Sequence, residues 1–220
     1  VRNGAAVQDL ADGRVLSQRL LPPGAVTLAL EVIDAAGATP MVIQGPAHGD
    51  AICTLLPERC HPAVAFYERL WARENTFRCV SSLRELSAMS DSTWVSGAGD
   101  HGAARSVYEA LRRLPGVSAR WTGGEGQVRE FAFAAVQPVC TKATALAEFA
   151  TRHEIGLHQI MAVGDYLNDV EMLREVGWGV AMGQAPDAVK AAADAVTLDN
   201  ARDGCAVAIE RYVLGTAAQS

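Results

Sequence analysis

The chain has 220 residues, of which 50% are hydrophobic and 20% charged, and its formal net charge at pH 7 is −6. It is long enough for one large or two small domains with a substantial core. The acidic balance and the lack of a basic stripe argue against a nucleic acid partner, and no apolar run approaches the roughly 18 residues of a membrane span.

The five cysteines favour a cytoplasmic protein with reduced thiols. Their number is odd and they form no C-x-x-C pair, which argues against a disulfide framework or a zinc site. The N-terminus also lacks the charged and apolar segments of a signal peptide. We therefore predict a cytoplasmic location and no membrane partner.

The first part of the chain predicts short strands and helices. Asp12-Gly13 lies between two strand-like triplets in residues 5–20, which predicts a hairpin. Apolar residues at helical spacing followed by Gly37 predict a helix over 25–36. The other expected elements are strands at 39–44 and 93–96, helices at 62–72 and 103–114, and an antiparallel strand pair at 117–121 and 128–136.

From Thr141 onward, helices and strands alternate. The helices are expected at 143–153, 168–176, 186–192 and 205–214, and the strands at 158–163, 179–182 and 195–197. This alternation is typical of a parallel, doubly wound sheet. We therefore predict an α/β protein of two units, with a mixed α+β module over 22–138 and a Rossmann-like unit formed by 1–21 and 139–220.

The most informative segment is residues 164–169, which read Gly-Asp-Tyr-Leu-Asn-Asp and follow the apolar run 160–163. A strand that ends in Gly-Asp and turns into a helix places a carboxylate at the carboxyl edge of the sheet, where open α/β sheets bind ligands. Carboxylate and amide oxygens suit a hard cation such as Mg²⁺. The candidate site residues are Lys142, Asp165, Asn168 and Asp169.

Each candidate has a simpler structural interpretation. A lysine near a helix start is usually a solvated surface charge. Asp165 and Asn168 could cap the following helix, and this role is compatible with metal binding. Asp169 could support a metal or simply favour the first turn of that helix.

The order of the motifs resembles the haloacid dehalogenase-like (HAD) superfamily, in its Cof-type subfamily IIB with a C2B cap. The resemblance covers almost the whole chain and is weakest over 22–138. The segments that carry it are Asn3-Gly4-Ala5, Lys142-Ala143-Thr144-Ala145-Leu146, and residues 164–173, 179–185, 193–197 and 203–204.

The resemblance implies hydrolysis of phosphate esters through an aspartyl-phosphate, with Mg²⁺ as cofactor. Lys142 would bind the phosphoryl group and Asp165 would hold the metal. Asn168 would contact the phosphoryl group or order its loop, and Asp169 would support the metal directly or through water. Positioning and charge neutralisation are what phosphoryl transfer requires. Residues 22–138 would form the cap that covers the site and selects the substrate.

The family's nucleophile motif, D-x-D-x-T, does not occur in these 220 residues. Residues 9–13 read Asp-Leu-Ala-Asp-Gly, but their spacing is wrong and they fit a hairpin turn. Because the motif precedes Asn3 in the family's order, we expect the nucleophile upstream of Val1 and a core that is incomplete at the N-terminus. Ala143 also stands where the family usually has glycine.

These observations favour a Mg²⁺-dependent phosphatase acting on a small phosphorylated metabolite, either a sugar phosphate or a phosphorylated cofactor. A mannosyl-3-phosphoglycerate or sucrose-phosphate phosphatase is an alternative within the class. The alternative from another class is a catalytically inactive, truncated HAD protein that acts as a binding or assembly module. The sequence leaves a homodimer open.

Overall fold

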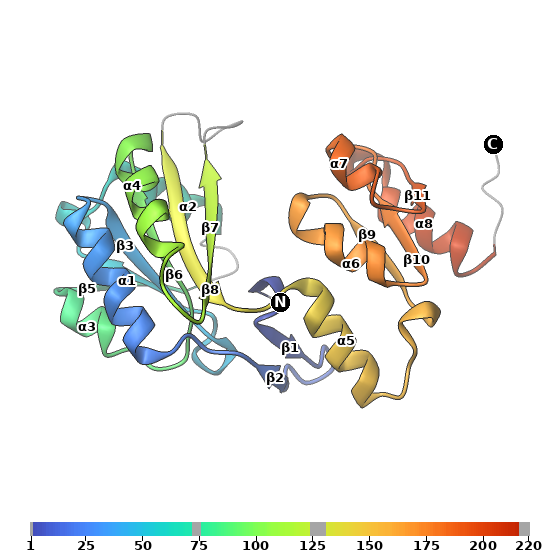
Figure 1. The fold of residues 1–220 in the computed structure, drawn as a ribbon, viewed down its shortest axis with the longest axis horizontal. Coiled ribbons are helices and arrows are strands. Elements are labelled where there is room, and N and C mark those ends of the chain that lie inside the picture. Colours follow the sequence, from blue (N-terminus) through green and yellow to red (C-terminus); the bar gives the residue numbers. More distant parts are fainter. Residues whose placement is uncertain (1, 72–75, 124–130, 216–220) are drawn as a thin grey trace. The chain divides into compact units, whose positions relative to one another are not determined.

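The computed structural model describes residues 2–71, 76–123 and 131–215 (Figure 1). Its contacts divide the chain into two compact units. One unit comprises Gly4–Val139 together with Arg2, and the other comprises Asn3 and the chain from Cys140 onward.

The Gly4–Val139 unit is built on a six-stranded sheet in the order β5-β4-β3-β6-β8-β7. Neighbouring strands run antiparallel except β4 and β5, which are parallel. The strands are β3 (Thr39–Gln44), β4 (Ile52–Leu55), β5 (Phe77–Val80), β6 (Ser92–Gly99), β7 (Val117–Gly123) and β8 (Ala132–Pro138).

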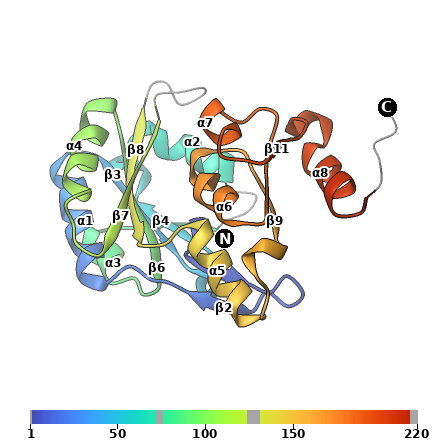
Figure 2. The same ribbon diagram turned by 45° about the vertical axis from the view of Figure 1, so that its right-hand side comes forward.

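Helices cover both faces of this sheet (Figure 2). On one face, buried residues such as Leu30, Leu86 and Val107 pack against Val42 and Val95 of the sheet. On the other face, Ala63 and Val64 pack with sheet residues of a second cluster. The helices of the first face are α1 (Pro23–Ala35), α3 (Leu83–Ser87) and α4 (His101–Leu111), and that of the second is α2 (Pro62–Trp71).

The expected hairpin is confirmed as β1 (Ala6–Gln8) and β2 (Val15–Gln18), which pair antiparallel. Gly13, in the connecting turn, has a φ of 73°, a conformation that glycine adopts without a steric cost. The contacts group this hairpin with the Gly4–Val139 unit, whereas the sequence analysis assigned residues 1–21 to the other one. The division into a cap at 22–138 and a core at 1–21 and 139–220 stays a proposal.

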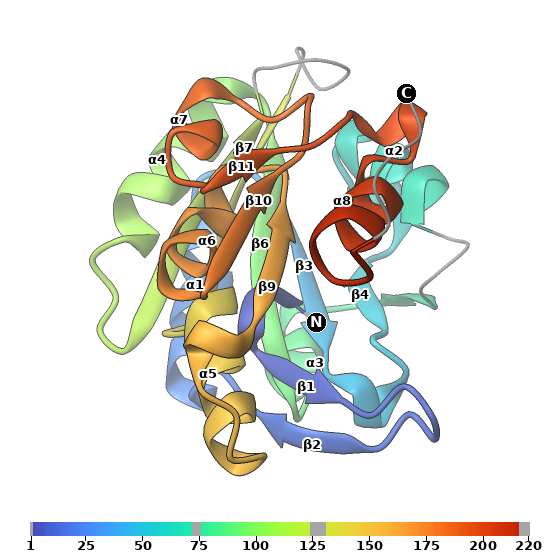
Figure 3. The ribbon, with the colours of Figure 1, turned by 90° about the vertical axis from the view of Figure 1, so that its right-hand side faces the viewer.

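The second unit has the predicted parallel βα pattern, with strand order β11-β10-β9 (Figure 3). Figure 3 shows α6 and α7 on one side of these strands and α8 on the other. The strands are β9 (Met161–Gly164), β10 (Trp178–Ala181) and β11 (Ala195–Val196), and the helices are α5 (Lys142–Arg152), α6 (Val170–Glu175), α7 (Asp187–Lys190) and α8 (Gly204–Tyr212).

The register of these three strands brings the loops that follow them to one edge. Ala181 pairs with both Gly164 and Val196, the last residues of the flanking strands. Since the strands are parallel, the segments that begin at Asp165 and Met182 leave the sheet side by side, next to the chain that follows β11. Leu173 on α6 is 1% exposed and belongs to the core beneath this edge.

The sequence analysis missed β4, β5 and α3, and it misplaced several boundaries, including the end of β6, both ends of α4 and the start of β9. Residues 157–159, which include the first two residues of the strand expected at 158–163, form a 3-10 helix, and β9 starts only at Met161. All four residues of β4 are buried, so the alternation of apolar and polar residues that marks a half-exposed strand is absent. Part of the strand expected at 128–136 lies outside the described residues.

None of the helices in the described ranges is both long and apolar enough to cross a membrane.

Gly97 allows α1 to pack closely on the centre of the six-stranded sheet. A Cβ added there would lie 3.0 Å from both Cγ1 and Cγ2 of the buried Ile33. We expect Gly97→Ala to lower the free energy of unfolding by about 1–3 kcal/mol, the usual cost of overpacking a core. The matched control is Gly24→Ala, since a Cβ at Gly24 of α1 meets nothing within 4 Å and alanine favours helix. Urea denaturation checks both variants, and equal stability of the two would contradict this account of α1 packing.

Candidate functional site

The loop after β9 is closed by its own last carboxylate. The 3-10 turn Leu167–Asp169 leads into α6, and Asp169 Oδ2 accepts hydrogen bonds from the backbone N–H of Asp165 (3.1 Å) and of Tyr166 (3.2 Å). A Cβ at Gly164 would lie 2.5 Å from Asp169 Cβ, so this close approach needs glycine. Gly164 and the Asp169 carboxylate are therefore required by the loop geometry as well as by any chemistry.

Lys142 binds the other oxygen of the same carboxylate. Its Nζ lies 2.6 Å from Asp169 Oδ1, and the side chain of Asp169 is only 2% exposed whereas that of Lys142 is 38% exposed. Lys142 is the first residue of α5, whose start is fixed by a capping box between Thr141 and Thr144. The ion pair thus holds an ammonium group at the carboxyl edge of the sheet while part of it stays accessible.

Asn168 is oriented by a residue from the opposite end of the chain. Its Nδ2 donates to Asn3 Oδ1 at 2.8 Å. Asn3 has a φ of 54°, in the left-handed region that asparagine tolerates better than most residues. The bond fixes which way the amide of Asn168 faces.

Asp165 is exposed and is linked to the loop after β10. Gln184 Nε2 donates to Asp165 Oδ2 at 3.4 Å, and Gln184 Oε1 accepts from the backbone N–H of Asn200 at 3.1 Å. All four candidate residues therefore lie in one unit, and hydrogen bonds link the segments that carry them to one another or to their neighbours. Their chemical roles stay proposals.

Asp165 fits a role as a Mg²⁺ ligand. Mg²⁺ is commonly held by one or two carboxylates and keeps several waters and substrate oxygens, so one exposed carboxylate suffices. Both oxygens of Asp169 already have partners, which favours a supporting role for this residue through Lys142 and the loop backbone. Among residues 2–71, 76–123 and 131–215, no group of three or more His, Cys, Asp and Glu side chains could by itself hold a metal ion.

A second charged pair lies close to this edge of the sheet. Arg202 Nη2 lies 2.8 Å from Asp199 Oδ2, and its hydrogen bond holds the pKa of the Asp199 carboxyl below its usual range. Asp199 immediately precedes Asn200, whose N–H binds Gln184. The pair therefore orders the segment that anchors the glutamine.

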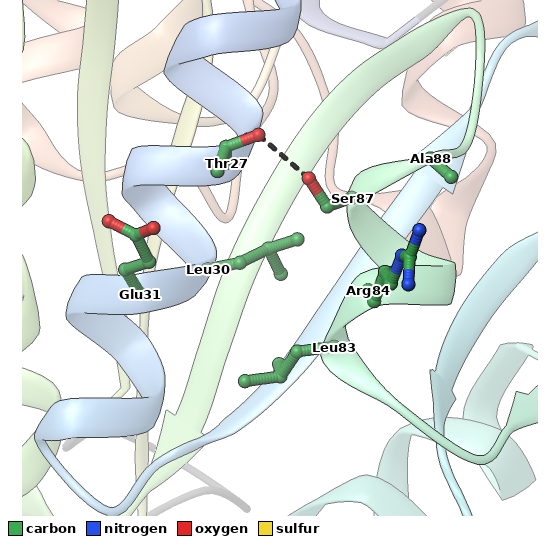
Figure 4. Close-up of a pocket in the computed structure, with 7 residues that line it drawn as sticks. All are labelled: Thr27, Leu30, Glu31, Leu83, Arg84, Ser87 and Ala88. Atoms are coloured by element: carbon green, nitrogen blue, oxygen red, sulfur yellow. Dashed lines mark hydrogen bonds between the residues drawn. The ribbon is translucent and has the colours of Figure 1, made fainter.

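The groove shown in Figure 4 belongs to the Gly4–Val139 unit, and none of the four candidate site residues lines it. It has a volume of about 390 Å³, lies between α1 and α3, and includes a 2.7 Å hydrogen bond between the hydroxyls of Thr27 and Ser87. Glu31 and Arg84 are the charged residues that line it.

Two residues of this edge had no assigned role in the sequence analysis, namely Asn3 and Gln184. Both lie in segments that carry the family resemblance, and this was the sequence feature that could have pointed to a role for them. Their partners could not be foreseen, because Asn3 binds a residue 165 positions away and Gln184 joins two loops.

Comparison with known proteins decides the family. The family model of haloacid dehalogenase-like hydrolases matches residues 84–209, which is more than half of the chain. The chain belongs to this family. A crystal structure of a haloacid dehalogenase-like hydrolase from Bacteroides thetaiotaomicron superposes with a TM-score of 0.79 at 25% identity, covering 95% of this chain and 74% of that one. The structure of a HAD subclass IIB sugar phosphatase, BT4131, shares the fold with a TM-score of 0.72 at 24% identity, covering 98% of this chain and 74% of that one.

Similarity to a curated relative is higher but local. The chain is 48% identical over 73 residues to 5-amino-6-(5-phospho-D-ribitylamino)uracil phosphatase YcsE of Bacillus subtilis, a match that covers 33% of this chain and 29% of that protein. The match thus spans less than a third of the length of this relative, and the activity of the whole protein is a matter for proposal.

Asp169 should be essential to the stability of this unit. We expect Asp169→Asn to lower the free energy of unfolding by about 2–4 kcal/mol, because an amide offers only one acceptor oxygen to the three donors around it and leaves the ammonium without a counter-charge. Glu171→Gln is the matched control, since Glu171 is exposed on the adjoining helix. Chemical denaturation monitored by circular dichroism measures both. A loss for Asp169→Asn no larger than for the control would show that the pair contributes nothing.

Proposed function

We propose that the protein is a Mg²⁺-dependent phosphatase acting on a small phosphorylated metabolite. The observation that supports this most directly is the grouping of an ammonium, an exposed carboxylate and an oriented amide at the carboxyl edge of a parallel sheet. These are Lys142, Asp165 and Asn168. Membership of the haloacid dehalogenase-like hydrolases supports the same activity.

Each residue has a distinct task in this proposal. Lys142 donates hydrogen bonds to a phosphoryl oxygen, and Asp169 holds its ammonium group in place. Asp165 holds Mg²⁺, which when bound neutralises negative charge on the phosphoryl group. Asn168, held by Asn3, either donates a hydrogen bond to the phosphoryl group or orders the loop that faces this group. Such fixed positive groups stabilise the charge that spreads over the phosphoryl oxygens during transfer.

The nucleophile is the first aspartate of the expected D-x-D-x-T motif upstream of Val1. Its carboxylate attacks phosphorus, the bond to the ester oxygen breaks, and the second aspartate gives that oxygen its proton. The same residue then takes a proton from water, which attacks the aspartyl-phosphate and releases phosphate. The residues of this chain position the phosphoryl group for both steps.

The proposed substrate class is a sugar phosphate or a phosphorylated cofactor. Two relatives support this range, one named for a phosphorylated ribitylamino-uracil and one titled as a sugar phosphatase. Mannosyl-3-phosphoglycerate and sucrose phosphate stay as narrower alternatives. A catalytically inactive binding module is the competing proposal, and cytoplasmic location and homodimerisation stay predictions.

Removal of the Asp165 carboxylate tests the metal assignment. On the full-length protein, with any residues that precede Val1, we expect Asp165→Asn to reduce Mg²⁺-dependent hydrolysis of p-nitrophenyl phosphate at least about 100-fold, since the metal would lose its main protein ligand. Asp187→Asn, at an exposed acid that begins α7, serves as the control. Retention of activity within a few-fold would remove Asp165 from the metal site, and a wild-type protein without phosphatase activity would favour the binding module.

The role of Lys142 is tested with Lys142→Ala. The matched control is Lys190→Ala, since Lys190 is the only other lysine of the 220 residues. Lys142→Ala should reduce turnover at least about 100-fold because it removes the fixed ammonium that holds the phosphoryl group. Since this change also leaves Asp169 unpaired, circular dichroism and Lys142→Arg, which keeps the charge, accompany the assay. An unchanged rate in folded Lys142→Ala would take this residue out of the site.

A further inference from the structure

Gln184 connects the segments that follow all three parallel strands. It lies in the loop after β10, its Nε2 donates to Asp165 after β9, and its Oε1 accepts from the N–H of Asn200 after β11. Few side chains could do this, because the task needs one donor and one acceptor at the tip of a three-bond stem.

The backbone that presents Gln184 is closely packed. A Cβ at Gly183 would lie 2.8 Å from the backbone nitrogen of Asp199, and Gly183 N–H donates to Leu198 O at 3.0 Å. On the other side, Ala185 is 3% exposed. The exposed glutamine side chain therefore starts from a fixed point.

The orientation of its amide is decided by its partners. The N–H of Asn200 can only donate, so the oxygen of Gln184 must face it. The amide nitrogen then faces the carboxylate of Asp165, which accepts. The distance of 3.4 Å is long for a hydrogen bond, and such bonds in active sites often tighten only when the ligand binds.

We propose that Gln184 is a positioning residue that fixes the Asp165 carboxylate for cation binding. The inference rests on the proposed function, in which Asp165 holds Mg²⁺. One oxygen of Asp165 is held by Gln184, and this directs the rest of the carboxylate toward the cation. Without this bond, an exposed aspartate rotates freely and loses conformational entropy when it binds metal.

Two substitutions separate positioning from mere loop anchoring. Gln184→Met keeps the length of the side chain but removes both hydrogen bonds. Gln184→Glu keeps an acceptor for the N–H of Asn200 but turns the donor that faces Asp165 into a second carboxylate. The matched control is Gln159→Met, since Gln159 is also exposed and its Oε1 also accepts one backbone N–H, from Gly156, but it precedes β9 at the opposite end of that strand.

The first measurement is binding of Mn²⁺, as a probe for Mg²⁺, to the full-length protein by electron paramagnetic resonance. We expect Gln184→Met to raise the Kd about 3–10-fold, as the loss of one hydrogen bond predicts, and Gln159→Met to leave it unchanged. Gln184→Glu should not lower the Kd, because loss of the donor to Asp165 offsets the attraction of the added negative charge to the cation.

The possible outcomes are distinct. A Kd for Gln184→Met equal to that of the wild type overturns the inference and leaves the phosphatase proposal intact. So does a Kd for Gln184→Glu about 3-fold or more below that of the wild type alongside weakened binding in Gln184→Met, because this pattern means that Gln184 only anchors the loop. If the wild type binds no Mn²⁺, the metal assignment of Asp165 fails and the inference fails with it.

Discussion

The buried carboxylate of Asp169 is the constraint on which the site depends. A carboxylate that is 2% exposed needs full compensation, and it receives this from the ammonium of Lys142 and two backbone N–H groups. These three partners come from the start of α5 and from the loop after β9. One side chain thus fixes the position of Lys142 and the shape of the loop that presents Asp165.

Close backbone approach at the sheet edge makes this arrangement rigid. Gly164 ends β9 and Gly183 lies just after β10, and neither position has room for a Cβ. The register of β9, β10 and β11 aligns the ends of the strands, so loops that are distant in sequence become neighbours. The polar side chains at this edge are then close enough to hydrogen-bond across loops that are distant in sequence.

Much of the fold could be predicted from patterning, and the failures have a physical cause. The hairpin was found from its Asp-Gly turn, and α1 and α4 were found from the helical spacing of their apolar residues, with Gly37 marking the end of α1. The elements after Thr141 were found from their alternation of helix and strand patterns. The strand Ile52–Leu55 was missed because it is buried on both faces, which removes the alternation. The helix Leu83–Ser87 was missed because five residues are too few to show a helical period.

The sequence by itself determined the order of motifs, hence the family, and it identified Lys142, Asp165, Asn168 and Asp169 as candidates. Local spacing was sufficient for Asp165, Asn168 and Asp169, because the Gly-Asp loop and its helix are contiguous, whereas Lys142 was identified from its place in the order of motifs. Only the tertiary structure decided what each side chain contacts: Lys142 pairs with Asp169, Asn168 with Asn3 and Asp165 with Gln184. The register of β9 and β10 brings Gln184 to Asp165, whereas Lys142 and Asn3 reach the loop after β9 from the start of α5 and from the N-terminal turn. No local pattern relates these residues, because each pair is distant in sequence.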